Sequence, residues 1–325
     1  MSESVPISCV IPCLNEDANL NALLPVLTAV LRQLTTDYEI IVVDDGSTDA
    51  TAAHMIDWTR RFPEIVYMQL SRNFGKEAAL TAGLEAARGR VVVSMDADLQ
   101  HPPALIPKMF ERWKEGVEMV YAVRASRASE SVFKRVGTRI FYKLMRGSNG
   151  LHVPPNAGDF RLMDRAVVDA LMLLPERNRF MKGLFAWVGF RSEPLLYEPP
   201  ARLHGKSYFK PLRLFGFAID GLTAFTTWPL RLLSVVGICL SLLSFLYGIL
   251  VVVMHLLYGD PVQGWATLIT VILFFAGLQL ISLGVVGEYV ARIFSEVKMR
   301  PVYLVRRTVG RGIQSGPPEG DSERQ

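Results

Sequence analysis

Two aspartates, Asp96 and Asp98, stand one residue apart where an apolar segment of the sequence ends. Residues 90–96, RVVVSMD, have the composition of a buried strand. Carboxylates crowded together are costly without a cation between them, and Mg²⁺ binds proteins through one or two carboxylates together with substrate phosphates. The Asp-Ala-Asp motif therefore indicates a divalent cation, Mg²⁺ or Mn²⁺, held against a diphosphate.

Polar residues follow four other predicted strands in the same way. They are Pro12, Leu14, Asn15 and Glu16 after the first strand; Asp44, Asp45, Gly46 and Ser47 after the second; Ser71, Arg72, Asn73, Gly75 and Lys76 after the third; and Arg124 at the end of the fifth. Any one set could be a simple turn or a helix N-cap, as DDGSTD would be on its own. Five sets at one edge indicate a binding site, because ligands of open α/β sheets lie at the carboxyl ends of the strands.

Strand and helix patterns alternate through residues 1–125. The predicted strands are residues 7–14, 38–47, 65–71, 90–96 and 118–124, and the predicted helices are residues 15–34, a segment from 48, 76–87 and 103–116. Continuous apolar runs in the strands favour an α/β domain with a mostly parallel sheet covered on both faces. The sequence contains no G-x-G-x-x-G or G-x-x-x-x-G-K-[ST] motif, which argues against a dinucleotide fingerprint or a P-loop.

Two long apolar segments lie in the last third of the chain. Half of all residues are hydrophobic, and the excess is concentrated in residues 231–290. Residues 232–257 carry His255 as the one ionisable group besides Tyr and Cys, and residues 263–287 carry no charge. At about 1.5 Å rise per residue, each exceeds the roughly 30 Å of a bilayer core. We expect a transmembrane hairpin, since two buried helices of a soluble core would show a polar face.

Charge around the hairpin predicts its orientation. The loop between the two segments carries Asp260 and no Lys or Arg. The flanks carry Arg202, Lys206, Lys210, Arg213 and Arg231 on one side, and Arg292, Lys298, Arg300, Arg306 and Arg307 on the other. The positive-inside rule then places both termini in the cytoplasm. Because the first residues do not resemble a signal peptide, the front domain is expected on the cytoplasmic side.

The segments around the hairpin complete a five-part domain prediction. Residues 206–230 mix apolar residues with Lys210, Arg213, Asp220 and Trp228, which favours a helix along the membrane interface over a third span. The predicted parts are a domain over residues 1–205, this interface helix, the two spans within 231–290, a juxtamembrane segment over 291–310 and a disordered tail over 311–325.

A basic stretch over residues 131–147 could meet a lipid phosphate at the headgroup level. Lys134, Arg135 and Arg139, together with Lys210, are the candidate residues for this contact. The alternative is a solvated helix face. Nucleic acid is not expected as a partner of a basic helix beside two membrane spans.

The sequence resembles family 2 glycosyltransferases with the GT-A fold, of the type that uses polyprenyl phosphates. The segments that carry the resemblance include IPCLNED, EIIVVDDGSTDAT, MDADLQHPP, AGDFRLMD, LPERNRFMKGLFAWVGF and GLQLISLGVVGEYVARIF. It extends over roughly residues 5–305 and is strongest to bactoprenol-phosphate glucosyltransferases, with dolichol-phosphate mannose synthase more distant. The Q-x-x-R-W motif of processive polysaccharide synthases is absent from the sequence.

The resemblance implies roles for individual residues. Nucleotide-sugar contacts are implied for Pro12, Leu14, Glu16, Asp44, Asp45, Lys76, Asp96, Ala97, Arg124, Arg202 and Lys206, and metal ligation for Asp96, Asp98 and Gln100. Asp159 matches a residue proposed as a general base in glucosyl relatives, although mannose synthases carry Ser there. A family Lys is replaced by Tyr208 in this chain, and Lys206 or Lys210 could substitute for it.

The implied reaction moves a hexose from a nucleotide sugar to undecaprenyl phosphate. The second pKa of a phosphate monoester is about 6, so the acceptor needs no deprotonation at neutral pH. Asp159 could therefore orient Arg161 or the acceptor instead of acting as a base, while Asp98 assists the leaving group. UDP-glucose is the expected donor, with galactose, N-acetylhexosamine, mannose and aminoarabinose donors left open. The resemblance also implies the cytoplasmic membrane of a bacterium and a homo-oligomer, a tetramer.

Three other functions compete with this interpretation. A lipid transporter would need more than two spans and intramembrane charges. A catalytically inactive nucleotide-sugar-binding protein would not need Asp96, Asp98 and Arg124 together. A glycosyltransferase with a soluble acceptor would not need the hairpin.

Overall fold

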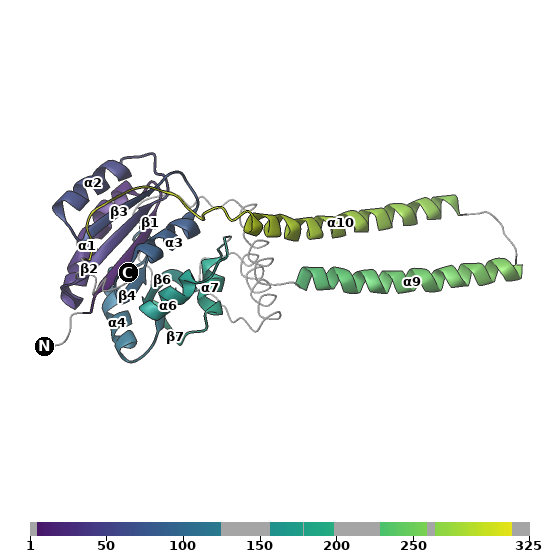
Figure 1. Cartoon of the computed structure of the whole chain (residues 1–325). Coiled ribbons are helices and arrows are strands. Elements are labelled where there is room, and N and C mark those ends of the chain that lie inside the picture. Colours follow the sequence, from purple (N-terminus) through teal and green to yellow (C-terminus); the bar gives the residue numbers. More distant parts are fainter. Residues whose placement is uncertain (1–4, 125–156, 178, 198–227, 259–263, 314–325) are drawn as a thin grey trace, which may run out of the picture.

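The computed structural model describes residues 5–124, 157–177, 179–197, 228–258 and 264–313. These residues form an α/β domain from which two long helices project side by side (Figure 1). Most of the predicted interface helix lies outside the described residues, together with Arg202, Lys206, Tyr208 and Lys210, and only its last residues, 228–230, are described. The basic stretch with Lys134, Arg135 and Arg139 also lies outside them.

An eight-stranded sheet forms the centre of the described domain, in the order β7-β5-β6-β4-β1-β2-β3-β8. Four neighbouring strands, β4 (Val91–Ser94), β1 (Ile7–Cys13), β2 (Tyr38–Asp44) and β3 (Ile65–Leu70), are parallel. Every residue of β1 and β2 is buried, as expected for parallel strands covered on both faces. The predicted α/β class with a mostly parallel sheet is confirmed.

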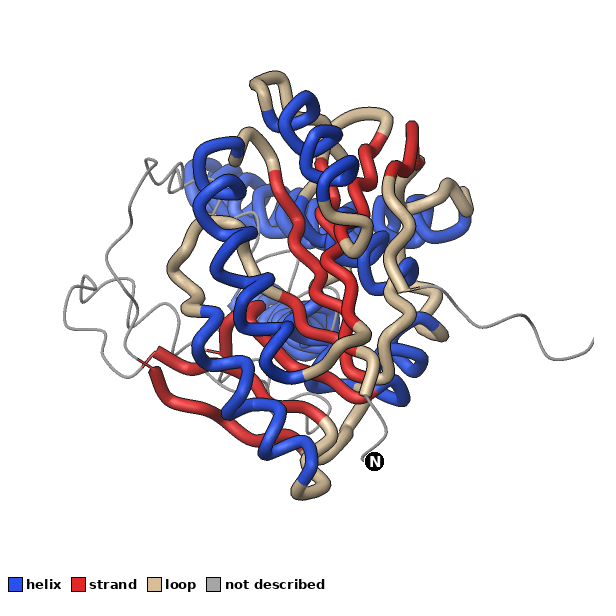
Figure 2. The backbone as a smooth tube through the Cα atoms, turned by 90° about the vertical axis from the view of Figure 1, so that its left-hand side faces the viewer, coloured by secondary structure: helices blue, strands red, loops and turns tan. Residues whose placement is uncertain are grey.

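Helices cover both faces of the sheet, because alternate strand residues point to opposite sides. On one face, Ile7, Cys9 and Ile11 of β1 belong to an apolar cluster with residues of three helices, α1 (Asp17–Leu34), α2 (Thr51–Arg61) and α4 (Ile106–Lys114). The short helix η1 (Pro103–Leu105) directly precedes α4. Val10 belongs to a second cluster with α3 (Lys76–Ala86), α6 (Arg165–Met172) and α7 (Met181–Trp187). Figure 2 shows helices on the two sides of the strands.

A strand of opposite direction is inserted into the sheet. β6 (Ala157–Asp164) pairs antiparallel with β4 on one side and with β5 (Met119–Arg124) on the other, and β7 (Ser192–Tyr197) is parallel to β5. Arg161 stands opposite Ser94 in this register. The amino end of β6 therefore lies at the edge where the parallel strands end, which brings Asp159 to the same edge as Asp96.

The expected helical hairpin is present as α9 (Trp228–Tyr258) and α10 (Trp265–Val297). Their apolar side chains are exposed; Leu257 and Leu280, for example, are 67% and 70% exposed. Surfaces of this kind fit a lipid environment. Phe274–Val297 in α10 is long and apolar enough to cross a membrane, and Leu232–Tyr247 in α9 is a shorter apolar stretch.

The second helix continues beyond the predicted limit at residue 287. It carries Glu288, Arg292 and Glu296 before it ends at Val297. The carboxylate of Glu296 accepts hydrogen bonds of 3.1 and 3.2 Å from the backbone N–H of Arg177, in the loop that follows α6. The charged last turns of α10 thus contact the α/β domain. This contact explains why the helix extends beyond its apolar residues.

The chain returns from α10 to the sheet. β8 (Val305–Val309) pairs antiparallel with β3, and Tyr303 donates a hydrogen bond of 2.5 Å to Glu85 of α3. Ile313 is 8% exposed. The juxtamembrane segment expected over residues 291–310 therefore contains a strand, and the tail expected to be disordered from residue 311 is ordered through Ile313.

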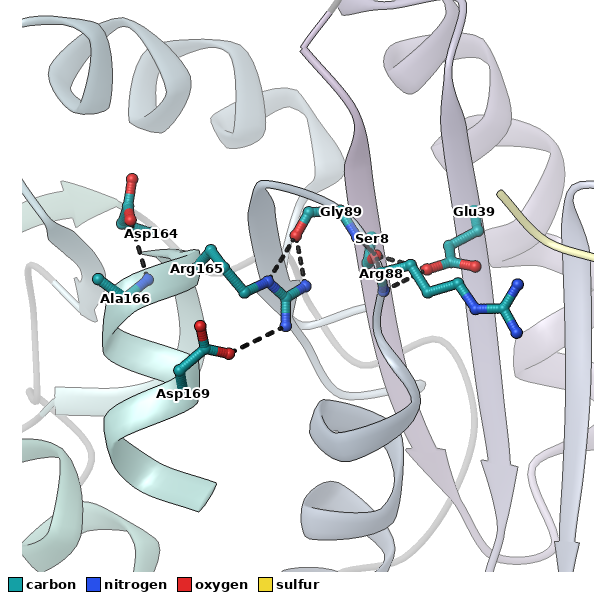
Figure 3. A network of polar contacts seen from close by, with 8 residues as sticks. All are labelled: Ser8, Glu39, Arg88, Gly89, Asp164, Arg165, Ala166 and Asp169. Carbon is teal, nitrogen blue, oxygen red and sulfur yellow. Dashed lines mark hydrogen bonds and ion pairs between the residues drawn. The ribbon is translucent and has the colours of Figure 1, made fainter. Parts of the chain in front are cut away.

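A buried carboxylate holds the end of this returning segment. Glu39, at 2% exposure, accepts hydrogen bonds from the Ser8 hydroxyl (2.6 Å) and from the backbone N–H groups of Arg88 (2.8 Å) and Ile313 (3.1 Å). The Arg88 guanidinium donates to the carbonyl of Ile313 at 3.0 Å. Figure 3 shows Ser8, Glu39 and Arg88 together, with Arg165 of α6 bonded to the Gly89 carbonyl beside them. This network lies at the amino ends of β1, β2 and β4, opposite the edge that carries the predicted site.

Candidate active site

A cleft of about 360 Å³ opens at the carboxyl ends of the parallel strands. It is lined by Pro12, Cys13, Leu14, Glu16, Asp45, Asn73, Gly75, Lys76, Ala79, Asp96, Ala97 and Asp98. These residues come from the ends of β1, β2, β3 and β4 and from the first turns of α3. The topology therefore brings members of each polar set predicted after the first four strands into one site.

Asp45 fixes the loop that follows β3. Its two carboxylate oxygens accept hydrogen bonds from the backbone N–H groups of Phe74 (2.7 Å) and Gly75 (2.9 Å). Gly75 precedes α3 with φ of 102°, a conformation that L side chains rarely adopt. Burial raises the pKa of Asp45, and these two N–H donors act against the shift. A carboxylate at the end of β2 thus positions the start of α3, whose first residue is Lys76.

Lys76 joins Asp96, which lines the cleft, to Asp159, which lies beside the cleft and is not among its lining residues. Its Nζ lies 2.5 Å from Asp96 Oδ1 and 2.6 Å from Asp159 Oδ2. Burial alone would lower the pKa of Lys76, but Asp159 and Asp96 outweigh it and raise the pKa above its ordinary value. The ammonium group therefore stays charged at neutral pH and links the strand end at β4 to β6.

Asp159 stands in a positive environment. The Ser94 hydroxyl donates a hydrogen bond of 2.7 Å to its backbone carbonyl, which fixes β6 beside β4 at this point. Burial would raise the pKa of the Asp159 carboxyl, but Lys76, then Lys182 of α7 and Arg161, hold it well below the usual range. The side chain is therefore ionised at neutral pH, and it accepts hydrogen bonds readily but accepts a proton poorly.

Asp44 differs from its neighbour Asp45 and from the sequence-based expectation. It is fully buried, and it is not among the residues that line the cleft. Its carboxylate accepts hydrogen bonds from the backbone N–H of Ser47 (2.7 Å) and from the Tyr67 hydroxyl (2.6 Å). The predicted contact of Asp44 with a donor has no support in this geometry, because its oxygens hold the turn after β2.

Arg161 is also buried, at 2% exposure, beneath the site. Its Nε donates to the Gly158 carbonyl at 3.1 Å, and its guanidinium carbon lies 4.1 Å from the centre of the Phe185 ring and 5.4 Å from that of Tyr121. It does not line the cleft. Arg161 therefore acts on Asp159 through its charge, and its catalytic role stays a prediction.

The Asp-Ala-Asp turn carries the donors that a hard cation prefers. Asp96 and Asp98 line the cleft, and the backbone N–H of Gln100 donates to Asp98 Oδ1 at 3.2 Å. Within the described ranges, no group of three or more His, Cys, Asp or Glu side chains could hold a metal ion. Two carboxylates fit a cation that completes its coordination with ligand phosphates, as Mg²⁺ and Mn²⁺ do on nucleotides. Ligation by the Gln100 side chain stays a prediction.

The remaining predicted residue of this edge is Arg124. It is the last residue of β5, opposite Tyr197 of β7. Because β5 runs in the same direction as β4, the backbone of Arg124 lies at the edge that carries the cleft. Its predicted contact with the donor stays a prediction.

Three titratable residues near the site were not predicted from the sequence. Burial and the charge of Asp159 raise the pKa of Glu77 to about 7, against the effect of Lys76 and Lys182. His101 is 5% exposed, and its Nδ1 accepts a hydrogen bond of 3.2 Å from the backbone N–H of Asp96. Glu77 follows Lys76 directly and His101 belongs to the DADLQHPP segment, so the neighbouring motifs in the sequence could have indicated both residues. Lys182 of α7 acts on Asp159 and Glu77 through its charge, and no local pattern in the sequence indicated it.

Two family models match this chain, one in its first half and one in its last third. The model of the family "Glycosyl transferase family 2" matches residues 8–172, which is the part that contains the cleft. The model "GtrB C-terminal hairpin" matches residues 228–293, which contain α9 and most of α10.

Similar proteins extend over nearly the whole chain. An uncharacterized glycosyltransferase of Synechocystis sp. is 46% identical over 302 residues, 93% of this chain and 95% of its own. The SfII prophage-derived bactoprenol glucosyl transferase of Shigella flexneri is 40% identical over 306 residues, 93% of this chain and 98% of its own. Among solved structures, glucosyl-3-phosphoglycerate synthase from Mycobacterium tuberculosis aligns with 68% of this chain and 78% of its own, at 23% identity and a TM-score of 0.48.

Proposed function

This chain belongs to glycosyl transferase family 2, and from that premise we propose that it transfers glucose from UDP-glucose to undecaprenyl phosphate at a membrane. The observation that carries the proposal is the placement of Lys76 between Asp96 and Asp159 in a cleft on the same chain as an apolar hairpin. The name of the Shigella flexneri relative, a bactoprenol glucosyl transferase, supports a lipid acceptor and glucose as the sugar.

The donor half of the reaction requires a site for a nucleoside diphosphate. Pro12, Leu14 and Glu16 line the same cleft as Asp96 and Asp98. Mg²⁺ or Mn²⁺ held by Asp96 and Asp98 would supply positive charge to the leaving diphosphate. Lys76 brings a second, permanent positive charge to the same place. Metal dependence is part of the proposal.

The acceptor half requires orientation more than proton removal. A lipid phosphate with a second pKa of about 6 is mostly a dianion at pH 7 and attacks without a base. An ionised Asp159 held by Lys76 suits the task of orienting the reacting groups better than that of accepting a proton. A phosphate oxygen forms a bond to the anomeric carbon as the bond from that carbon to UDP breaks, and the electron pair leaves with UDP. One such step inverts the configuration, so an α-linked donor gives a β-linked product.

The location of the protein follows from the same proposal. An acceptor that is anchored in the bilayer must meet the cleft at the headgroup level. α10 contacts the α/β domain through Glu296, and the segment that follows the helix contacts it through Tyr303. We place the protein in the cytoplasmic membrane of a bacterium, with both termini and the cleft on the cytoplasmic side. The homo-oligomer implied by the resemblance stays a prediction.

Transfer of labelled sugar to undecaprenyl phosphate tests the proposal. Membranes that contain the protein are given a panel of labelled UDP- and GDP-sugars, with Mg²⁺ or with EDTA. Asp98→Asn removes one cleft carboxylate, and Asp57→Asn is the matched control because Asp57 is exposed on α2 and pairs only with Arg60 among the contacts of the described chain. Label should enter the lipid from UDP-glucose, persist in the control and disappear with EDTA or Asp98→Asn. A protein that binds UDP but labels no lipid from any donor would refute the proposal.

A further inference from the structure

One buried histidine contacts both carboxylate-bearing elements of the site. His101 follows Asp96 by five residues, and its Nδ1 accepts the hydrogen bond from the Asp96 backbone N–H. Since Nδ1 is the acceptor in a neutral ring, the ring proton is on Nε2. The His101 side chain therefore closes the Asp-Ala-Asp turn on itself.

The same ring packs against the strand that carries Asp159. It is stacked on Phe160, the residue after Asp159, with ring centres 5.2 Å apart and an angle of 23° between the planes. Tyr197 of β7 meets its edge at 6.4 Å. A Cβ added to Gly158 would lie 3.9 Å from His101 Nε2, so the far side of the ring faces the start of β6. His101 thus spans from the turn after β4 to β6.

The turn that His101 closes has a conformation that needs support. Leu99 has φ of 59°, in the left-handed region that side chains other than Gly, Asn and Asp rarely occupy. Two hydrogen bonds hold this turn from inside, one from Asp96 N–H to His101 and one from Gln100 N–H to Asp98. The first would leave a partly buried donor without this partner if the acceptor were removed, and only this bond ties the Asp96 backbone to a side chain that also packs on β6.

We propose that His101 is a positioning residue that holds Asp96 and Asp98 in the arrangement that accepts a divalent cation, in register with Asp159 on β6. The proposal deepens the proposed function, on which its metal depends. It assigns two separable tasks to the side chain. The acceptor nitrogen holds the turn, and the flat ring packs on Phe160.

Two substitutions separate these tasks. His101→Asn keeps an acceptor near the position of Nδ1 and loses the ring. His101→Phe keeps a flat ring against Phe160 and loses the acceptor. Both are made in the full-length protein, and UDP binding in EDTA shows that each variant is folded. The readouts are Mn²⁺ binding in the presence of UDP, followed by electron paramagnetic resonance, and hydrogen–deuterium exchange of residues 95–101 without metal.

The hydrogen-bond acceptor Nδ1 of His101 is expected to contribute more to Mn²⁺ binding than its ring does. His101→Phe should weaken Mn²⁺ binding about tenfold, the effect of losing one partly buried hydrogen bond, and should speed exchange at the Asp96 amide. His101→Asn should stay within about threefold of the unchanged protein. In the transfer assay, His101→Phe should need more Mn²⁺ for half-maximal rate and regain its kcat at saturating Mn²⁺, which a general loss of structure would not allow.

Several results would overturn the inference. They are unchanged Mn²⁺ affinity and exchange in His101→Phe, equal impairment of the Asn and Phe variants, or a wild-type protein that binds no Mn²⁺ with UDP. If His101→Phe fails to bind UDP, the Asn variant decides alone, and weakened Mn²⁺ binding there contradicts the inference. Because Mn²⁺ binding and exchange need no sugar transfer, the expected pattern in a protein that glycosylates no lipid would refute the proposed function and leave the role of His101 standing.

Discussion

Lys76 and Asp159 lie 83 residues apart in the sequence, and their side chains meet at 2.6 Å. The contact exists because α3 begins at the carboxyl end of β3 while β6 runs against β4 and starts at the same edge of the sheet. It joins the cleft, which is lined by residues that follow the parallel strands, to the inserted strand beside it.

Removing the charge of Lys76 should disable transfer. Lys76→Met leaves the carboxylates of Asp96 and Asp159 facing each other without a cation, so kcat/KM should fall about 10²- to 10³-fold, the usual cost of removing one electrostatic donor from an active site. Lys76→Arg keeps the charge and should retain part of the activity. Steady-state kinetics with UDP-glucose and undecaprenyl phosphate provide the measurement. A Lys76→Met enzyme within fivefold of the unchanged enzyme would exclude the bridging role.

Glu77 should make stability fall as the pH rises. Its pKa is raised in the folded protein from 4.5 to about 7, so the folded state binds more protons than the unfolded state between these values. Glu77→Gln removes this titration and should raise the free energy of unfolding above pH 7, by at most about 3 kcal/mol. This gain in the free energy of unfolding should shrink as the pH falls from about 7 to 4.5 and vanish below pH 4.5.

Thermal unfolding in detergent at pH 4 and pH 8 measures this difference. Glu85→Gln is a poor control because Glu85 bonds Tyr303, so Glu111→Gln on the exposed side of α4 is used instead. A stabilisation by Glu77→Gln that is equal at both pH values would contradict the assigned pKa.

Two adjacent aspartates should give different phenotypes. Asp44→Ala leaves the Tyr67 hydroxyl without its buried partner and should destabilise the fold by about 1–3 kcal/mol. Asp45→Ala releases the loop that leads to Lys76 and should weaken UDP binding more than it lowers the unfolding temperature. Unfolding curves and UDP titrations of the two variants make the comparison. The reverse pattern would show that Asp44 faces the donor, a contact that the family resemblance implied for both aspartates.

The returning C-terminal segment should stabilise the α/β domain. A Cβ at Gly310 would lie 2.2 Å from the Ile65 carbonyl oxygen, and its φ is 108°, so Gly310→Ala should detach β8 and cost about 2 kcal/mol or more. Gly116→Ala is the matched control, because φ is 91° there but nothing lies within 4 Å. Limited proteolysis after residue 300 and thermal unfolding report the effect. Equal behaviour of the two variants would mean that β8 contributes nothing beyond local backbone strain.

Much of the sheet could be predicted from the sequence. Parallel strands covered on both faces are continuous apolar runs, and β1 to β5 fall within one to three residues of the predicted ends. The Asp-Ala-Asp turn was found for the same reason, since charged residues rarely follow such a run without a task. The transmembrane hairpin was visible in composition alone, although the last turns of α10 were not.

Other features depend on pairing that no local pattern records. β8 reads VRRTV and lies at the edge of the sheet with four of its five residues exposed, so it shows no apolar alternation. Asp44 and Asp45 have the same side chain, and which of them points into the cleft depends on how the strand ends. The antiparallel direction of β6 places Asp159 in the site, and the sequence offered only a family resemblance for that residue.

Product analysis tests the central claim most directly. Purified protein is incubated with UDP-glucose, in which the sugar is α-linked, and undecaprenyl phosphate, and the lipid product is examined by NMR at the anomeric position. The account predicts one β-linked glucosyl phosphate for each UDP released. An α-linked product, or UDP and free glucose with no lipid-linked sugar, would contradict a single displacement by the lipid phosphate in this cleft.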